Sequence, residues 1–184
     1  MTDASQAEFD LQALAEVCPT LSAAFCRMVA EASVVCLEDQ GHLSGIHIDV
    51  RGVAEAKVRV YWLTVTDEMR DTYADPEVAT EHGAIAVSIL TVRAFTEYTI
   101  IRRSMKGTGF DYWLSRSEYR PYRDDARLEI SGIRSGDFRQ LEARLRRKAR
   151  QTDRSDPGAP GLPAYIAVVE FSQPVSYLQR REVL

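Results

Sequence analysis

Apolar residues recur with the helical period of about 3.6 in three stretches of the chain, which predicts three helices. They span residues 9–38 with an interruption at Pro19, residues 75–94, and residues 137–150. After the proline, Thr20 is the expected N-cap of the first helix. The second helix begins at Asp75-Pro76-Glu77, where an acidic cap is followed by proline at the first helical position. In the third helix Asp137 and Gln140 have capping-box spacing.

Alternating or continuous apolar runs predict six strands. They lie at residues 46–50, 58–62, 98–101, 110–114, 126–133 and 164–171. The first two strands form a predicted hairpin with Gly52 in its loop, and Lys106–Gly109 is predicted to be a tight turn between the third and fourth. From Asp75 onward the order is helix, strand, strand, strand, helix, strand. We therefore expect an α/β fold whose core is residues 75–184, with residues 1–70 adding a helical segment and a β-hairpin packed on it.

The composition is that of an ordinary globular chain of 184 residues, with 45% hydrophobic and 27% charged residues and a net charge of −4. Because the chain is not a polycation, contact with nucleic acid would require a local basic surface. The three cysteines have no CxxC spacing, which favours a reducing compartment over a disulfide framework or a zinc knuckle. The N-terminus is polar, and no apolar run approaches the ~20 residues that cross a bilayer. We expect a cytoplasmic protein with no membrane partner.

Two acidic residues interrupt apolar runs, Asp111 within Phe110–Leu114 and Glu129 within Leu128–Ile130. The strand period of two sets each acid on the face opposite its apolar neighbours, so adjacent antiparallel strands would bring both acids together. Glu81 lies on the inward stripe of the helix that starts at Asp75 and offers a third carboxylate. A buried carboxylate must be paired, solvated or metal-bound. Salt bridges to the many nearby arginines remain the alternative for the strand acids, and a favourable helix dipole remains the alternative for Glu81.

This order of elements and acids resembles the PD-(D/E)xK superfamily of restriction-endonuclease-like nucleases. The family signature is an acid on the first helix, an aspartate in the second strand and ExK in the third. Here these places are held by Glu81, Asp111 and Glu129-Ile130-Ser131. The resemblance implies an αβββαβ core with a mixed central sheet flanked by helices. It also implies Mg²⁺ or Mn²⁺ held by the three acids and the backbone carbonyl of Ile130.

The sequence departs from the family signature at the lysine, because Ser131 stands in its place. A serine cannot orient or activate a water molecule electrostatically. We predict that Lys106, in the turn that enters the Asp111 strand, replaces it, while Arg127 shares a strand face with Glu129 and is a second source of charge. If neither reaches the acids, the fold is present and the chemistry is weak or lost. Gln151 lies near the position of a polar site residue in some relatives.

The predicted helix at 137–150 is strongly basic and carries one internal acid, Glu142. In a chain of net negative charge, this reversal of sign predicts a phosphate-contacting surface that is independent of sequence and sensitive to salt. A solvated helix face is the alternative. The predicted nucleic-acid-binding residues are Arg144, Arg146, Arg147, Lys148 and Arg150.

Together these features predict a divalent-metal-dependent nuclease, a hydrolase that acts as an endonuclease on DNA, with Asp111, Glu129 and Lys106 as catalytic residues. No sequence-reading module is evident, so a partner subunit, a homodimer or the N-terminal extension would select the target. By analogy with the resembled family, the expected role is genome defence against viruses or DNA processing. The rival hypothesis, supported by Ser131, is a non-catalytic subunit or adaptor with a nuclease-like fold that binds DNA or partner proteins. A third hypothesis is a protein with scattered acids and no site.

Overall fold

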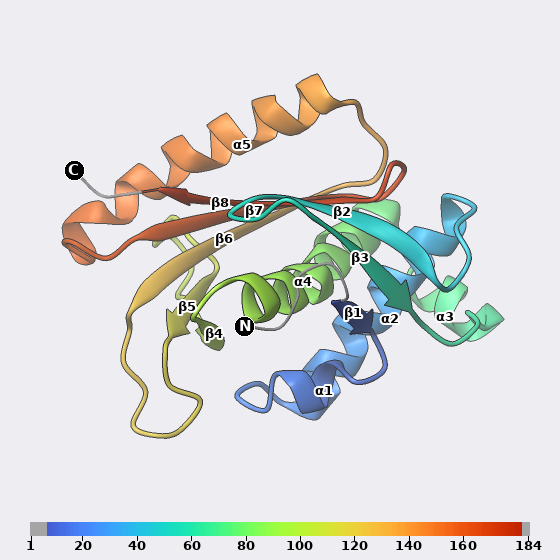
Figure 1. Cartoon of the computed structure of the whole chain (residues 1–184), viewed down its shortest axis with the longest axis horizontal. Coiled ribbons are helices and arrows are strands. Elements are labelled where there is room, and N and C mark those ends of the chain that lie inside the picture. Colours follow the sequence, from blue (N-terminus) through green and yellow to red (C-terminus); the bar gives the residue numbers. More distant parts are fainter. Residues whose placement is uncertain (1–6, 182–184) are drawn as a thin grey trace.

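A mixed eight-stranded sheet flanked by helices forms the centre of the molecule (Figure 1), in a computed structural model that describes residues 7–181. The strand order is β1-β3-β2-β8-β7-β6-β5-β4. The strands are β1 (Glu8–Asp10), β2 (Ile46–Gly52), β3 (Ala56–Tyr61), β4 (Thr99–Arg103), β5 (Tyr112–Ser115), β6 (Ala126–Ile133), β7 (Ala164–Glu170) and β8 (Val175–Arg181). The expected α/β class is confirmed.

Helices cover both faces of this sheet, with α4 and α2 on one face and α5 on the other (Figure 1). The helices are α1 (Leu14–Val17), α2 (Ala23–Asp39), α3 (Asp67–Thr72), α4 (Pro76–Phe95) and α5 (Phe138–Thr152), and a 3₁₀ turn (Asp153–Gly158) follows α5. From α4 to β7 the element order is the predicted one. The short helix α1 lies within the helical stretch predicted before Pro19, whereas β1, at the start of that stretch, and α3 were not predicted.

Helix caps account for how well the two later helices were predicted. The Asp75 side chain accepts hydrogen bonds from the backbone amides of Glu77 and Val78, and Asp137 with Gln140 makes a complete capping box. The prediction for the first helix was wrong at its start. Its cap is Ser22, because the hydroxyl of Thr20 instead donates a 2.5 Å hydrogen bond to the carbonyl of Ile100.

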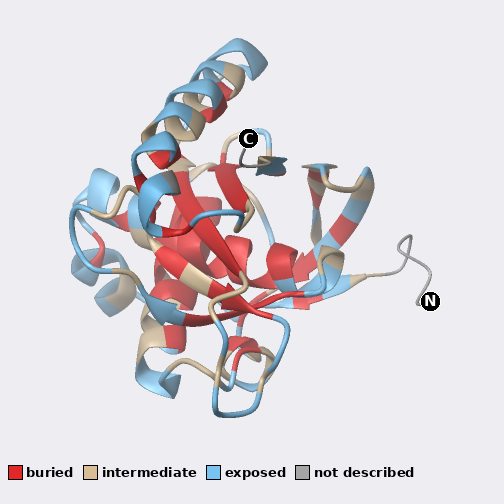
Figure 2. Ribbon diagram, turned by 90° about the vertical axis from the view of Figure 1, so that its left-hand side faces the viewer, coloured by how far each residue is buried: buried red, intermediate tan, exposed pale blue. Residues whose placement is uncertain are grey.

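The strand β8 was missed by the sequence pattern and is central to the sheet. It pairs antiparallel with β7 and parallel with β2, so it joins the N-terminal hairpin to the strands of the core in one continuous sheet. Its neighbour β7 is buried at every position, as its continuous apolar sequence predicts. Figure 2 shows that buried residues are concentrated in the sheet and α4, whereas the outer face of α5 is largely exposed.

The helix α4 passes through the interior and packs closely against α2. A Cβ atom added at Gly83 would lie 2.9 Å from the Cα of Ser33, so the small residue permits this close approach. By length and composition α4 is the one described helix that could span a bilayer. No such run was expected from the sequence. However, 67% of that apolar stretch is buried against the rest of the fold, which is the behaviour of a core helix.

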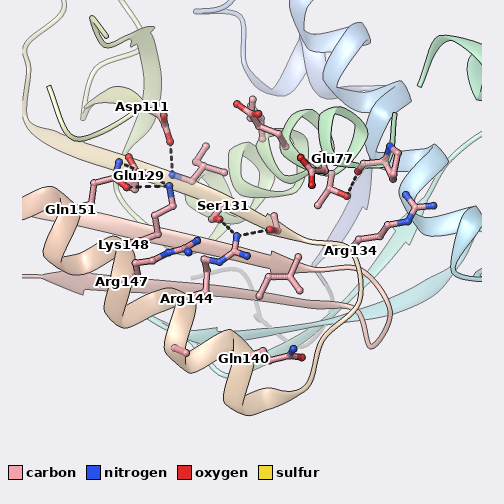
Figure 3. A pocket seen from close by; sticks show the side chains of 18 of the residues that line it. Glu77, Asp111, Glu129, Ser131, Arg134, Gln140, Arg144, Arg147, Lys148 and Gln151 are labelled. Atoms are coloured by element: carbon pink, nitrogen blue, oxygen red, sulfur yellow. Dashed lines mark hydrogen bonds and ion pairs between the residues drawn. The ribbon is translucent and has the colours of Figure 1, made fainter. Parts of the chain in front are cut away.

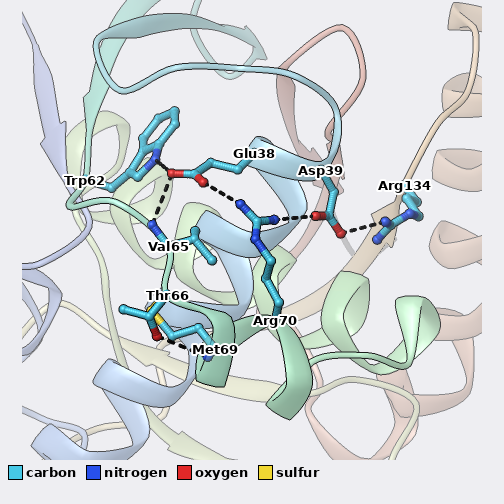
Figure 4. Close-up of polar contacts among 8 residues, drawn as sticks. All are labelled: Glu38, Asp39, Trp62, Val65, Thr66, Met69, Arg70 and Arg134. Carbon is cyan, nitrogen blue, oxygen red and sulfur yellow. Dashed lines mark hydrogen bonds and ion pairs between the residues drawn. The ribbon is translucent and has the colours of Figure 1, made fainter.

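An ion-pair network ties the N-terminal segment to the end of β6 (Figure 4). The Arg70 guanidinium lies 2.9 Å from carboxylate oxygens of both Glu38 and Asp39. The second oxygen of Asp39 accepts a 2.8 Å hydrogen bond from Arg134, while Glu38 also accepts one from the indole of Trp62. The network therefore holds Arg134, just after β6, in a fixed position.

Candidate functional site

The two strand acids lie next to each other at the junction of β5 and β6. Asp111 directly precedes β5, and its backbone amide bonds to the carbonyl of Leu128, which fixes it beside the middle of β6. One carboxylate oxygen of Asp111 accepts a 2.8 Å hydrogen bond from the backbone amide of Ile130. Glu129 is on β6 between these two positions and faces α5, so the period of two places its side chain opposite Leu128 and Ile130.

Glu129 is nearly inaccessible, with 1% of its side chain exposed, and its two carboxylate oxygens differ. Oε1 accepts hydrogen bonds from Lys148 Nζ at 2.6 Å and from Gln151 Nε2 at 2.8 Å. Oε2 is buried and has no hydrogen-bond partner among the described residues. Burial above all, and then the negative charge of Asp111, raise the pKa of Glu129 to about 7, while Lys148 opposes that shift.

The cation at the acid pair comes from α5 (Figure 3). Lys148 is the residue that donates to Glu129, and Gln151, one helical turn later, shares the same acceptor. In contrast Lys106 is exposed in the β4–β5 turn, and no described hydrogen bond or ion pair joins it to either acid. Arg127 is fully buried and donates to the Ser155 hydroxyl and the Leu162 carbonyl, which fastens the segment after α5 to β6.

A second cation from α5 contacts Ser131, the residue that stands where the resembled signature has lysine. Arg144 Nη1 donates hydrogen bonds of 2.7 Å to the Ser131 hydroxyl and 3.0 Å to the Gly132 carbonyl. Burial and the neighbouring charge of Arg147 lower the pKa of Arg144. Arg144 and Lys148 are four residues apart and hence on one face of the helix, and both lie along the same stretch of β6 (Figure 3).

The packing of α5 explains why these cations face the sheet. Leu141 and Leu145 are buried against Ile166 and Val168 of β7, which sets the helix over β6 and β7. The residues that flank this apolar stripe then point along β6. Because of this packing, some of the α5 charges that the sequence predicted on the solvent face line the site instead.

A cavity of about 940 Å³ opens between the first turns of α4, the second half of β6 and α5 (Figure 3). Glu81 also lines it together with Asp111 and Glu129. Its side chain is exposed, however, and not buried with the inward stripe of α4 as the sequence predicted. Burial, followed by the negative charges of Asp111 and Glu81, raises the pKa of Tyr112 to about 12, although Arg103 opposes the shift. Its hydroxyl is buried and has no hydrogen-bond partner among the described residues.

The oxygen atoms at this cavity meet part of the ligand requirement of a hard divalent cation such as Mg²⁺. Within residues 7–181, no three Asp, Glu, His or Cys side chains gather closely enough to form a metal-binding group by themselves. The paired acids, the unpartnered Glu129 Oε2 and the backbone carbonyl of Ile130 supply oxygen ligands of the kind that Mg²⁺ takes while it retains several waters. Coordination by Glu81 as a third carboxylate stays a prediction.

Four of the five predicted nucleic-acid-binding residues line a hollow beside the acid pair, and one does not. Arg144, Arg147 and Lys148 line the cavity, and Arg150 lines a neighbouring hollow. Arg146 lines neither and lies 3.8 Å from Glu142 on the same helix. Two further cations line the cavity, Arg103 at the end of β4 and Arg134 after β6, which the sequence suggested only as salt-bridge partners of the acids. No local signal placed either of them in the cavity, because both reach it through sheet pairing and the ion-pair network.

A scan against protein-family models, a search of curated proteins and a search of solved structures each give no match to this chain. The assignment of function therefore depends on the chemistry of the cavity.

Proposed function

We propose that the protein is a divalent-metal-dependent nuclease that hydrolyses phosphodiester bonds, with DNA as the substrate. The single observation that carries the proposal is the state of Glu129. This buried carboxylate is held by Lys148 through one oxygen and lies beside Asp111, while its other oxygen has no hydrogen-bond partner among residues 7–181. A structural salt bridge would not require a second carboxylate at the same place, because like charges in contact are destabilising.

The proposed metal ligands are Asp111, Glu129 and the backbone carbonyl of Ile130, with Glu81 on the opposite wall. A bound Mg²⁺ or Mn²⁺ supplies a water of lowered pKa and neutralises charge on the phosphate. Lys148 and Gln151 fix the orientation of Glu129, and the ammonium of Lys148 favours its ionised form. In this proposal Lys148 takes the role that the sequence resemblance gave to Lys106.

The arginines of α5 have the complementary role towards the substrate. Arg144 and Arg147 line the cavity that contains the acid pair, and a guanidinium group matches two oxygens of a phosphate at once. Charge that develops on the phosphate during hydrolysis would be stabilised by such fixed donors. The proposal includes the finer fold assignment, an αβββαβ nuclease core, and the element order from α4 to β7 supports it.

The test is cleavage of supercoiled plasmid and of end-labelled DNA and RNA oligonucleotides with Mg²⁺ or Mn²⁺. We expect nicking of DNA by the wild type and a loss of at least about 100-fold in Asp111→Asn, Glu129→Gln and Lys148→Met. Arg146→Ala is the matched control, because it removes an exposed charge of α5 outside the cavity. Intact DNA and RNA under every condition would contradict the nuclease proposal.

The second candidate is a non-catalytic subunit or adaptor that binds DNA or a partner protein. Ser131 at the place of the family's lysine favours it, although Arg144 and Lys148 bring positive charge to the same stretch of β6. It predicts that DNA binds and stays intact, and that Asp111→Asn leaves binding unchanged. A part in genome defence or DNA processing in the cytoplasm, with a partner subunit or as a homodimer, belongs to this functional proposal.

A further inference from the structure

A second hollow of about 770 Å³ lies on the other side of the acid pair, between the β4–β5 turn and the last turn of α5. It shares residues of its wall with the first cavity, so the two meet where the acids lie. The shared residues are Arg103, Asp111, Glu129, Arg147 and Gln151. Together the two hollows form one depression, with the acid pair between them.

Positive charge predominates over negative charge in the lining of the second hollow, with five cations against two acids. Its cations come from three parts of the chain, and they are Arg103, Lys106, Arg147, Arg150 and Arg154. Its acids are the catalytic candidates Asp111 and Glu129 alone, whereas Glu77 and Glu81 add negative charge to the first cavity. A polyanion would therefore be attracted more strongly to the second hollow than to the first.

None of these five cations forms a described ion pair with a carboxylate, which sets them apart from many arginines elsewhere on the protein. Arg70 pairs with Glu38 and Asp39, and Arg102 pairs with Asp124. Gathering like charges without counter-charges costs free energy in the unbound protein, and a bound anion removes that cost. The unpaired state of this cluster is the property expected of a phosphate-binding surface.

The shape of the second hollow is fixed by a close contact between the turn and the helix. Gly109 has a positive φ of 87°, and a Cβ atom there would lie 2.9 Å from the carbonyl oxygen of Gln151. The Thr108 hydroxyl bonds to the Met105 carbonyl at 2.8 Å, which braces the turn internally. Met105, 80% exposed, also lines the hollow and offers an apolar surface beside the cations.

We propose that the second hollow is a backbone-binding groove that holds the consecutive phosphodiesters of a polynucleotide next to the one at the acid pair. The inference rests on the proposed function for the role of the acid pair, but binding in the groove requires neither metal nor cleavage. Lys106, which the sequence predicted to be catalytic, is in this proposal a phosphate-binding residue of the groove. Arg150 and Arg154 contact the backbone beyond it.

The experiment measures binding of fluorescein-labelled DNA and RNA oligonucleotides, single-stranded and duplex, in EDTA over a range of salt concentrations. The test variant is Lys106→Ala with Arg154→Ala. The control variant is Arg139→Ala with Arg146→Ala, which removes the same charge from exposed positions of α5 that line neither hollow. The DNA and RNA arms identify which polynucleotide the groove takes.

We expect the test variant to bind at least about 10-fold more weakly than the control variant. Two lost phosphate contacts should reduce the slope of log K against log salt by about 1.4 on single strands or about 1.8 on duplex. Gly109→Ala, which shifts the turn and keeps every charge, should also weaken binding. Equal losses in the test and control variants, or no binding of any oligonucleotide by the wild type in about 50 mM salt, would overturn the inference.

The experiments distinguish a wrong groove proposal from a wrong nuclease proposal. If the groove is correct and the nuclease is not, the test variant binds weakly while wild-type protein with Mg²⁺ leaves the bound strand intact. If the nuclease is correct and the groove is not, cleavage depends on Asp111 while the test variant binds and cleaves as the control variant does.

Discussion

Lys148 Nζ lies 2.6 Å from Glu129 Oε1, and this contact joins the C-terminal half of α5 to the middle of β6. The lysine keeps 18% of its side chain exposed, while the glutamate keeps 1%. Because the acid is desolvated more than its partner, one hydrogen bond does not bring its pKa back to the ordinary value of 4.5. Glu129 is therefore poised to change its protonation near neutral pH.

The raised pKa of Glu129 predicts that stability decreases with pH in a defined range. Between pH 4.5 and about 7 the native state keeps the proton that the unfolded state has released, so the free energy of unfolding falls as pH rises. The total change is on the order of 3 kcal/mol, since each unit of pKa corresponds to about 1.4 kcal/mol. Urea unfolding at several pH values should show this fall in the wild type and not in Glu129→Gln. Parallel curves for the two proteins would contradict the assignment, and Glu142→Gln, on the exposed side of α5, should follow the wild type.

Removing Lys148 should show how much free energy it costs to keep the charge of Glu129 buried. Lys148→Met leaves Glu129 without its cation, so at pH 8 we expect a loss of about 3 kcal/mol in the free energy of unfolding and a further rise in the pKa of Glu129. Adding Glu129→Gln should recover most of that stability, because the buried charge is then gone. A double-mutant cycle from urea unfolding measures this coupling, and additive effects of the two substitutions would disprove a direct interaction.

Metal binding should stabilise the folded protein through the same acids. With 10 mM Mg²⁺ at pH 8, a site with a dissociation constant of about 1 mM adds about 1.4 kcal/mol. Thermal unfolding should show this as a rise of a few degrees in the wild type. The rise should be absent in Asp111→Asn and Glu129→Gln. The same rise in all three proteins would place the bound metal elsewhere.

The junction of α4 and β6 depends on a glycine. A Cβ atom at Gly132 would lie 2.4 Å from the backbone carbonyl oxygen of Thr80, so Gly132→Ala must push the helix away from the strand. We expect a loss of about 1–3 kcal/mol in unfolding free energy, and weaker Mg²⁺ stabilisation because Glu81 moves with the helix. Gly158→Ala is the matched control, since a Cβ atom there meets nothing within 4 Å and stability should change little.

Local sequence patterns were sufficient for most of the elements around the acids, although Asp111, predicted within the strand 110–114, lies just before β5. The Asp75 cap, the Asp137 capping box and the apolar strands at 126–133 and 164–171 all depend on neighbouring residues, and the structure has each of them. Thr20 was misassigned as a cap because its competing partner, the Ile100 carbonyl, is 80 residues away. The strand β8 was also missed, although one of its two partners, β7, directly precedes it in the chain.

The sequence by itself determined that Asp111 and Glu129 are acids beside apolar residues, and that Glu129 faces away from Leu128 and Ile130, because side-chain direction follows from the local period of the strand. Only the tertiary structure decided that Lys148, and not Lys106, contacts Glu129. That choice depends on how Leu141 and Leu145 seat α5 on β7, which sets the rotation of the helix about its axis. Such packing is a property of the assembled core, and so the partner of Glu129 could not be inferred from residues near it in the chain.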